Sequence, residues 1–157
     1  MENAKDSPGV YLPPPLVYVA TFFAAVFLQK KIFITDALFQ VTAIKIAGAL
    51  LLAIALVFLF TSLRQFFQTR NTLVPIKPAT SLQTTGIYTI SRNPMYAGLA
   101  ILYLGLACFV GNWWHAILFP LLLFTVQVFI IIPEEKYLTR RFGEAYLQYR
   151  KKVRRWV

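Results

Sequence analysis

Residues 93–132 read NPMYAGLAILYLGLACFVGNWWHAILFPLLLFTVQVFIII and contain no Lys, Arg, Asp or Glu. One straight helix of that length would run about 60 Å at about 1.5 Å per residue, twice the roughly 30 Å of a bilayer's hydrocarbon core. The stretch must therefore fold back on itself. Residues 111–115, GNWWH, supply turn formers followed by two tryptophans suited to a membrane interface. The stretch thus predicts two antiparallel membrane spans, near residues 94–110 and 114–132.

Two further apolar runs lie towards the N-terminus. Residues 16–28 are apolar apart from one threonine, and residues 46–63 carry no charge. Of the 157 residues, 58% are hydrophobic and 14% are charged, whereas soluble domains contain about 45–50% apolar residues. The chain therefore predicts an all-α integral membrane helical bundle of about four transmembrane helices in a single membrane domain, residues 1–157. We expect the two N-terminal spans in residues 1–65 and the remaining core in residues 66–157.

The formal net charge of +10 raises the question of a nucleic-acid partner. Its distribution argues against one, because residues 136–155 hold eight of the sixteen Lys and Arg residues, next to an apolar run. Positive charge at the ends of spans marks the cytoplasmic side and contacts anionic lipid headgroups. An even number of spans then places both termini in the cytoplasm. One cysteine and no Cys/His cluster offer no metal site. We therefore expect a lipid bilayer as a partner, and neither nucleic acid nor metal.

Two segments lie outside the predicted spans. Residues 68–92 contain two prolines and a glycine and show no sustained period, so they are expected to form a loop. From Glu134 to Trp156, apolar residues recur every three or four positions with basic residues between them, which is typical of an amphipathic helix. Gly143 is expected to break this C-terminal helix in two. Such a helix commonly lies in the membrane interface.

The start of the third predicted span carries unusual polar chemistry. Asn93 before Pro94 is a helix-start signal, an N-cap side chain followed by proline at the first helical position. Because the fourth span runs antiparallel, Glu134 and Glu135 should return beside Asn93 and Tyr96 at the start of the third span. Paired acids at the end of a span are unfavourable for the helix dipole. They therefore suggest a cationic or polyhydroxyl partner.

At these residues the chain resembles a known family. GIYTISRNPMYAG at residues 86–98 and EEKYLTRRFGEAYLQYRKKVRRW at residues 134–156 are similar to the integral-membrane methyltransferases of the isoprenylcysteine carboxyl methyltransferase and phospholipid methyltransferase superfamily. The shared motifs are Gly-x-Tyr, Arg-(His or Asn)-Pro-x-Tyr-x-Gly, a double Glu, and Phe-Gly-x-x-Tyr-x-x-Tyr, in the same order and spacing. The resemblance covers roughly residues 70–156, and residues 1–65 match only as generic spans.

The resemblance implies that residues 66–157 form a methyltransferase core with an S-adenosylmethionine pocket at the cytoplasmic ends of the last two spans, closed by the C-terminal segment. It also implies that Glu134 binds the ribose hydroxyls or the amino group of the cofactor. Glu134 forms the predicted catalytic set with Arg92 and Arg141, and either arginine could orient an anionic acceptor. Tyrosine rings attract a sulfonium by cation–π interaction, and a carboxylate accepts hydrogen bonds from hydroxyl or ammonium groups. Carried over by position, the cofactor-binding residues are Thr80, Ser81, Leu82, Gln83, Tyr88, Asn93, Pro94, Met95, Tyr96, Glu134 and Glu135.

The motifs leave the methyl acceptor open. The isoprenylcysteine branch has His where this chain has Asn93, and an Arg one turn before the acid pair where this chain has Ile130. The lipophilic acceptor could be a phospholipid amine, a prenylcysteine carboxylate or a thiol-type small molecule. Direct in-line transfer is expected, because no Ser/His or Cys/His pair supports a covalent intermediate. The alternatives are a catalytically silent membrane anchor or binding module of the same fold and, less well supported because the spans carry no internal charge, a small transporter.

Overall fold

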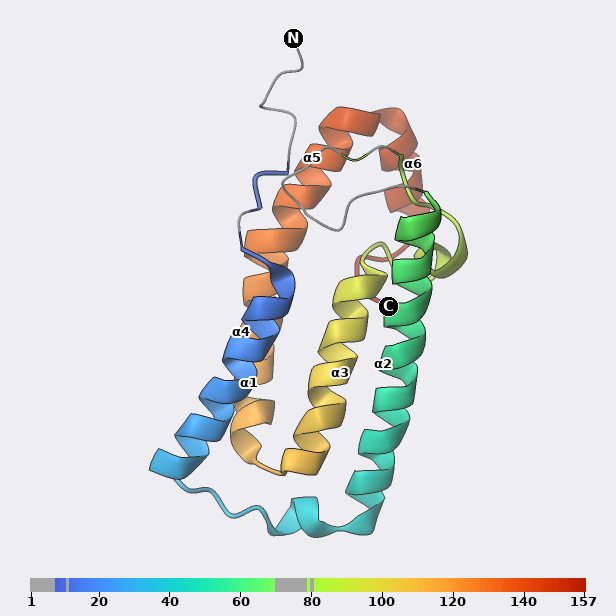
Figure 1. Ribbon diagram of the computed structural model, residues 1–157. Helices are drawn as coiled ribbons and strands as arrows, with labels where there is room; N and C mark the ends of the chain where they lie inside the picture. Colours follow the sequence, from blue (N-terminus) through green and yellow to red (C-terminus); the bar gives the residue numbers. More distant parts are fainter. Residues whose placement is uncertain (1–7, 11, 70–78, 80) are drawn as a thin grey trace.

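The computed structural model describes residues 8–10, 12–69, 79 and 81–157, and the regular elements in this part of the chain are helices (Figure 1). In chain order they are α1 (Pro14–Lys31), η1 (Ala37–Gln40), α2 (Thr42–Gln68), η2 (Gly86–Thr89), α3 (Pro94–Val110), α4 (Trp113–Val126), η3 (Gln127–Ile131), α5 (Ile132–Phe142) and α6 (Glu144–Lys152). The labels η1 and η2 denote short 3₁₀ helices, and η3 denotes a π-helical turn. The predicted all-α class is therefore confirmed for the described residues.

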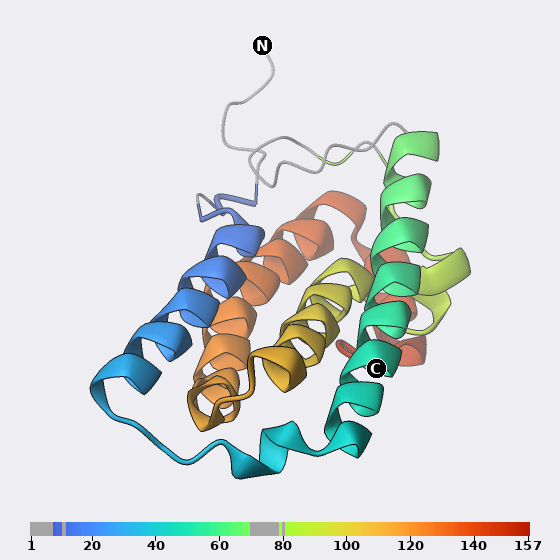
Figure 2. The same cartoon turned by 60° about the horizontal axis from the view of Figure 1, so that its bottom comes forward.

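The long helices form an antiparallel bundle of two pairs. α1 packs along α4, and α2 packs along α3 (Figures 1 and 2). α3 also contacts α1 and α4, so it occupies the centre of the bundle. The end of the bundle at which α3 begins also carries α5 and α6 (Figure 1), and we call it the site end. The opposite end holds the connection from α1 to α2 and the turn between α3 and α4 (Figure 2).

The turn between α3 and α4 is made by the residues predicted to make it. Gly111 ends α3 with a φ of +67°, a left-handed conformation that favours glycine. The Asn112 side chain accepts a hydrogen bond from the backbone N–H of His115 and so caps α4. The predicted third span, residues 94–110, coincides with α3. The predicted fold-back within the uncharged stretch is therefore confirmed.

The fourth predicted span does not end at residue 132. α4, η3 and α5 form one continuous helix from Trp113 to Phe142. Pro133 has no N–H to donate to a carbonyl one turn earlier, and the wider π-helical turn η3 directly before α5 lets the helix continue past it. Glu134 and Glu135 thus lie in the first turn of α5, inside this helix. The prediction that they occupy an unfavourable C-terminal helix end is wrong.

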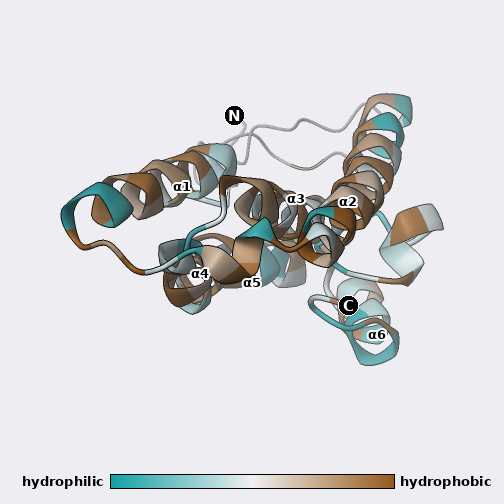
Figure 3. Cartoon of the chain, turned by 90° about the horizontal axis from the view of Figure 1, so that it is seen from below, coloured by the Kyte–Doolittle hydropathy of each residue, from teal (hydrophilic) through white to brown (hydrophobic). Residues whose placement is uncertain are grey.

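Large apolar side chains cover the outside of the bundle. Phe23 of α1, Phe60 of α2 and Phe124 of α4 are 64%, 68% and 60% exposed. Figure 3 shows hydrophobic residues along the long helices, with hydrophilic residues on α6 and at the end of α1, a distribution suited to lipid. Among the described residues, two helices have the length and composition of a membrane span, Thr42–Gln68 and Trp113–Phe142, whereas the apolar α3 is shorter. These helices indicate a membrane protein, and the count of four spans stays a prediction.

The C-terminal amphipathic segment is interrupted at the predicted glycine. Gly143 separates α5 from α6 with a φ of +53°. The apolar face of α6 is covered by the protein itself, because Tyr146 and Tyr149 form a buried cluster with Tyr88, against which Phe66 of α2 packs. This face is therefore not free to enter lipid, and the interfacial position of the C-terminal helix stays a prediction.

Glycines allow α2 and α3 to approach closely. A Cβ atom added at Gly48 of α2 would lie 2.7 Å from the Cβ atom of Cys108 and 3.1 Å from the carbonyl oxygen of Gly105, both on α3. A Cβ atom at Gly105 would lie 2.8 Å from the Leu52 side chain of α2. In lipid, helices associate through this kind of close van der Waals packing, because apolar side chains gain nothing by leaving apolar solvent. Gly48 and Gly105 therefore serve the close packing of α2 against α3.

We expect Gly48→Ala to destabilise the bundle. Overpacking costs about 1–3 kcal/mol, and alanine recovers about 1 kcal/mol over glycine in helix propensity, so the net loss should be about 1 kcal/mol. The control is Ala49→Leu, which adds more volume at an exposed position of the same helical turn and should leave stability unchanged. Thermal unfolding in detergent measures both variants. A Gly48→Ala protein as stable as its parent would contradict the close contact between α2 and α3.

Candidate functional site

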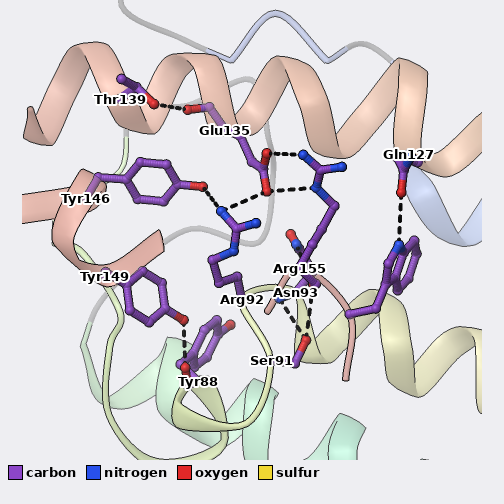
Figure 4. Close-up of polar contacts among 11 residues, drawn as sticks. Tyr88, Ser91, Arg92, Asn93, Gln127, Glu135, Thr139, Tyr146, Tyr149 and Arg155 are labelled. Atoms are coloured by element: carbon purple, nitrogen blue, oxygen red, sulfur yellow. Dashed lines mark hydrogen bonds and ion pairs between the residues drawn. The ribbon is translucent and has the colours of Figure 1, made fainter. Parts of the chain in front are cut away.

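Glu135 is the centre of a buried ion-pair network at the site end (Figure 4). Its Oε1 lies 3.2 Å from Nη1 of Arg92, and the Arg92 and Glu135 side chains are only 8% and 9% exposed. Arg155 donates Nε–H to Oε1 at 3.1 Å and Nη2–H to Oε2 at 2.8 Å. These hydrogen bonds raise the pKa of Arg155 above its usual value. Both Glu135 oxygens are thus engaged by cations of the protein, and direct contact of Glu135 with a cofactor stays a prediction.

Asn93 occupies the N-cap position of α3 as predicted, but its side chain does not cap the helix. The Asn93 amide instead donates to the carbonyl oxygen of Arg155 at 2.9 Å. Its backbone N–H donates to Oγ of Ser91 at 3.1 Å, and the backbone N–H of Arg92 donates to the carbonyl of Arg154 at 2.9 Å. The capping role predicted for Asn93 is therefore wrong, and its side chain is held by the C-terminal segment instead.

Residues 153–157, which we call the C-terminal strap, contact two parts of the site (Figure 4). On one side, main-chain carbonyls of the strap bind the loop before α3. On the other side, Arg155 pairs with Glu135, and the indole N–H of Trp156 donates to Gln127 at 3.1 Å. Sequence reasoning missed Arg155 and Trp156, because their partners are far away in the chain. The sequence feature that could have revealed Arg155 is the acid pair, because a buried carboxylate is usually paired with a cation.

Glu134 and its partner Tyr96 lie among further tyrosines. The Tyr96 hydroxyl donates to Oε1 of Glu134 at 2.7 Å, and the Tyr18 hydroxyl of α1 donates to the carbonyl of Tyr96 at 3.0 Å. Burial raises the pKa of Tyr88 far above its usual value, and the nearby Tyr149 and Glu134 add to this effect. In the described part of the chain, Oε2 of Glu134 has no hydrogen-bond partner. A free carboxylate oxygen beside tyrosines suits a cationic or hydroxyl-bearing ligand.

The tyrosines of α6 tie this helix to the site. The Tyr149 hydroxyl donates to the carbonyl of Tyr88 at 2.7 Å, and Nη1 of Arg92 donates to the Tyr146 hydroxyl at 3.4 Å. Burial and the nearby Glu135 raise the pKa of Tyr146 to about 12, and burial likewise raises the pKa of Tyr149. Both therefore stay protonated near neutral pH. They belong to the Phe-Gly-x-x-Tyr-x-x-Tyr motif, to which the sequence alone assigns no residue role.

The predicted loop residues lie beside α2 and α6 or outside the described part of the chain. Leu82 is half-buried against the cluster of Tyr88, and Gln83 accepts a hydrogen bond from Gln65 of α2 at 3.2 Å. The other two are Ser81, which is exposed, and Thr80, which lies outside the described residues. Their contacts with a cofactor stay predictions.

Three predicted residues complete the set. Pro94 is buried and Met95 is half-buried in the first turn of α3, whereas Arg141 is exposed in the last turn of α5. The structure thus brings together the Arg92–Glu135 pair and the Tyr96–Glu134 pair, and a role for Arg141 stays a prediction. Within residues 8–10, 12–69, 79 and 81–157, no group of three or more His, Cys, Asp or Glu side chains could hold a metal ion.

Comparisons with known proteins bear on this geometry. The phospholipid methyltransferase family matches residues 43–145, more than half of the chain. Protein-S-isoprenylcysteine O-methyltransferase of Schizosaccharomyces pombe is 44% identical over 72 residues, which are 46% of this chain and 30% of that protein. An uncharacterized protein of Haemophilus influenzae is 38% identical over 66 residues, which are 40% of this chain and 100% of that protein. No solved structure matches. The chain thus aligns with less than a third of the Schizosaccharomyces pombe protein.

Proposed function

The chain belongs to the phospholipid methyltransferase family, and on that basis we propose that it transfers the methyl group of S-adenosylmethionine to a lipophilic acceptor at the membrane face formed by the site end. The observation that carries the proposal is the Tyr96–Glu134 pair at the start of α3. It combines a carboxylate that has one unpartnered oxygen in the described part of the chain with nearby tyrosines. Both residues lie within the part of the chain that the family matches.

The side chains present fit this cofactor. The cofactor offers a sulfonium, an amino-acid group and ribose hydroxyls. Glu134 would accept hydrogen bonds from the ribose hydroxyls or the amino group, and the rings of Tyr88 and Tyr96 would attract the sulfonium.

The sulfonium supplies an activated methyl group, and the residues of the chain need to bind, orient and exclude water. The Tyr96 hydroxyl fixes Glu134 in position. The Tyr149 hydroxyl fixes the backbone at Tyr88, and α6 covers this side of the site. Because the contributing groups are held by hydrogen bonds before the ligand arrives, little reorganisation is needed at the moment of transfer. We infer direct transfer from donor to acceptor.

We further infer that the acceptor carries an uncharged nucleophile such as an amine or a thiol. Ile130 takes the position at which the isoprenylcysteine branch has an Arg, and it is fully buried in an apolar cluster with Val126 and Ile131. A carboxylate acceptor would therefore meet no cation at this position. A lipid amine or a lipophilic thiol fits better than a prenylcysteine carboxylate.

The proposal includes four spans with both termini in the cytoplasm. α1 and α3 pack within the bundle beside the two span-length helices, which supports counting them as spans. Positive charge concentrates at the site end, as expected for the cytoplasmic side of a membrane protein. The exposed cations of α5, α6 and the strap are Lys136, Arg140, Arg141, Arg150, Lys151, Lys152 and Arg154.

Calorimetric titration of the detergent-purified protein with S-adenosylmethionine, and with its demethylated product S-adenosylhomocysteine, tests the cofactor assignment. We expect saturable binding of both. Incubation of the protein and a labelled methyl donor with lipid extract should then yield a labelled lipophilic product, whose identification defines the acceptor. Folded protein that binds neither ligand would contradict the proposal and favour a catalytically silent binding module.

A further inference from the structure

We propose that Arg155 is a positioning residue for the cofactor site. The C-terminal strap holds two segments in their relative positions: α5, which carries Glu134, and the loop before α3, the helix that carries Tyr96. We call these two segments the supports of the Tyr96–Glu134 pair. This inference rests on the proposed function, because it gives Arg155 a part in binding S-adenosylmethionine. Arg155 does not contact the pair itself. Its side chain acts on α5 through Glu135. Its main-chain carbonyl acts on the loop before α3 through Asn93.

The first support is α5. Arg155 pairs with Glu135 in a bidentate arrangement, with nitrogen–oxygen distances of 3.1 Å and 2.8 Å, while Arg92 shares one of the oxygens at 3.2 Å. Planar bidentate pairing fixes the orientation of a carboxylate as well as neutralising it. Glu134 directly precedes Glu135, and the π-helical turn η3 interrupts the regular hydrogen bonding just before both. An anchor at Glu135 therefore limits rotation of the segment that carries Glu134.

The second support is the loop that leads into α3. The carbonyl oxygens of Arg154 and Arg155 accept from the Arg92 N–H and the Asn93 amide, each at 2.9 Å. The Asn93 side chain provides no helix cap, so the strap supplies the polar partners that this loop requires. Tyr96 follows in the first turn of α3. Fixing the loop therefore fixes the position of Tyr96, whose hydroxyl holds Glu134.

The competing explanation is that the Arg155–Glu135 ion pair is purely structural. A structural role and a positioning role make different predictions. A structural pair affects the stability of the fold and leaves the ligand affinity of the folded protein unchanged. A positioning residue affects the affinity itself. The family match ends at residue 145, before the strap begins, so the shared motifs alone do not assign Arg155 either role.

The test measures the affinity of S-adenosylhomocysteine by calorimetry in detergent for Arg155→Met, Arg155→Lys and the control Arg140→Met. Arg140 is exposed on α5, so the control removes the same charge and the same side-chain type without touching the network. We expect Arg155→Met to weaken binding about tenfold or more, as for the loss of hydrogen bonds to a charged group. Arg155→Lys, which keeps the charge and loses the bidentate geometry, should fall between Arg155→Met and the parent. Arg140→Met should stay within about twofold of the parent.

The outcomes separate this inference from the proposed function. Failure of the parent protein to bind S-adenosylhomocysteine overturns the proposed function and the inference with it. Binding by the parent with unchanged affinity in Arg155→Met overturns the inference alone, as does an equal loss in Arg140→Met. If Arg155→Met does not fold, Arg155→Lys decides: a clear loss of affinity in folded protein supports positioning, and parental affinity overturns it. Unfolding temperatures recorded without ligand report the stability effect separately.

Discussion

Replacing Glu135 with alanine should lower the stability of the protein by about 3–5 kcal/mol, the cost of removing one partner from a buried ion pair. The reason is that Arg92, with a side chain only 8% exposed, would keep its charge without a carboxylate. Arg155 would lose both of its hydrogen bonds to the same residue. We expect a large fall in the thermal unfolding temperature in detergent, larger than for any exposed substitution on α5 or α6.

A triple variant provides the matched control for this prediction. Arg92→Met, Glu135→Met and Arg155→Met together remove the charges from the network and leave apolar, unbranched side chains. Because replacing a whole buried ion network with apolar residues is often neutral or stabilising, the triple variant should recover most of the stability lost in Glu135→Ala. The triple variant should still bind S-adenosylhomocysteine poorly, since it lacks Arg155. Parental stability of Glu135→Ala would show that the three side chains are not paired in the membrane protein.

The sequence predicts those parts of the fold that depend on local signals. The uncharged stretch is too long for one span, so a turn at Gly111 and Asn112 follows from length and turn chemistry. The start of α3 at Pro94 and the break at Gly143 follow from proline and glycine in the same way. Each of these features is decided within a few residues, where backbone geometry leaves few choices.

Features that depend on distant partners could not be predicted. Asn93 is a good N-cap by residue type, but its side-chain amide instead donates to the carbonyl of Arg155, which lies 62 residues away in the chain. The continuous helix through Pro133 depends on the π-helical turn before it, which has no clear sequence signature. The prediction that the two acids return to the start of α3 is confirmed, since Glu134 accepts from Tyr96 and Glu135 pairs with Arg92, next to Asn93.

The two adjacent acids also have different environments that their sequence positions do not reveal. Glu135 faces two arginines, whereas Glu134 accepts from the neutral Tyr96 hydroxyl. Consecutive residues on a helix point about 100° apart, so one can face the ion network while the other faces the tyrosines. This division engages Glu135 in the ion network and supports the proposal that Glu134 is the carboxylate that binds a ligand.

Glu134→Gln should therefore weaken cofactor binding by about 1.5–3 kcal/mol, the range for a hydrogen bond to a charged group, or roughly ten- to a hundredfold in affinity. The substitution keeps the shape of the side chain and removes its charge. Tyr96→Phe is the matched control: it removes the hydroxyl that binds Oε1 of Glu134 and keeps the ring and the carboxylate. It should weaken cofactor binding less than Glu134→Gln does, because the carboxylate proposed to contact the ligand remains. Calorimetry with folded variants measures both.

Comparing two ligands on the Glu134→Gln protein then identifies the group that this carboxylate contacts. S-adenosylmethionine carries a sulfonium charge, and S-adenosylhomocysteine lacks it but keeps the ribose and the amino group. An equal loss of affinity for both ligands places Glu134 at the ribose hydroxyls or the amino group, as the family resemblance implies. A larger loss for S-adenosylmethionine places Glu134 near the sulfonium, where an opposite charge favours the cationic ligand. Unchanged affinity for both would remove Glu134 from the cofactor site, and with it the observation on which the proposed function chiefly depends.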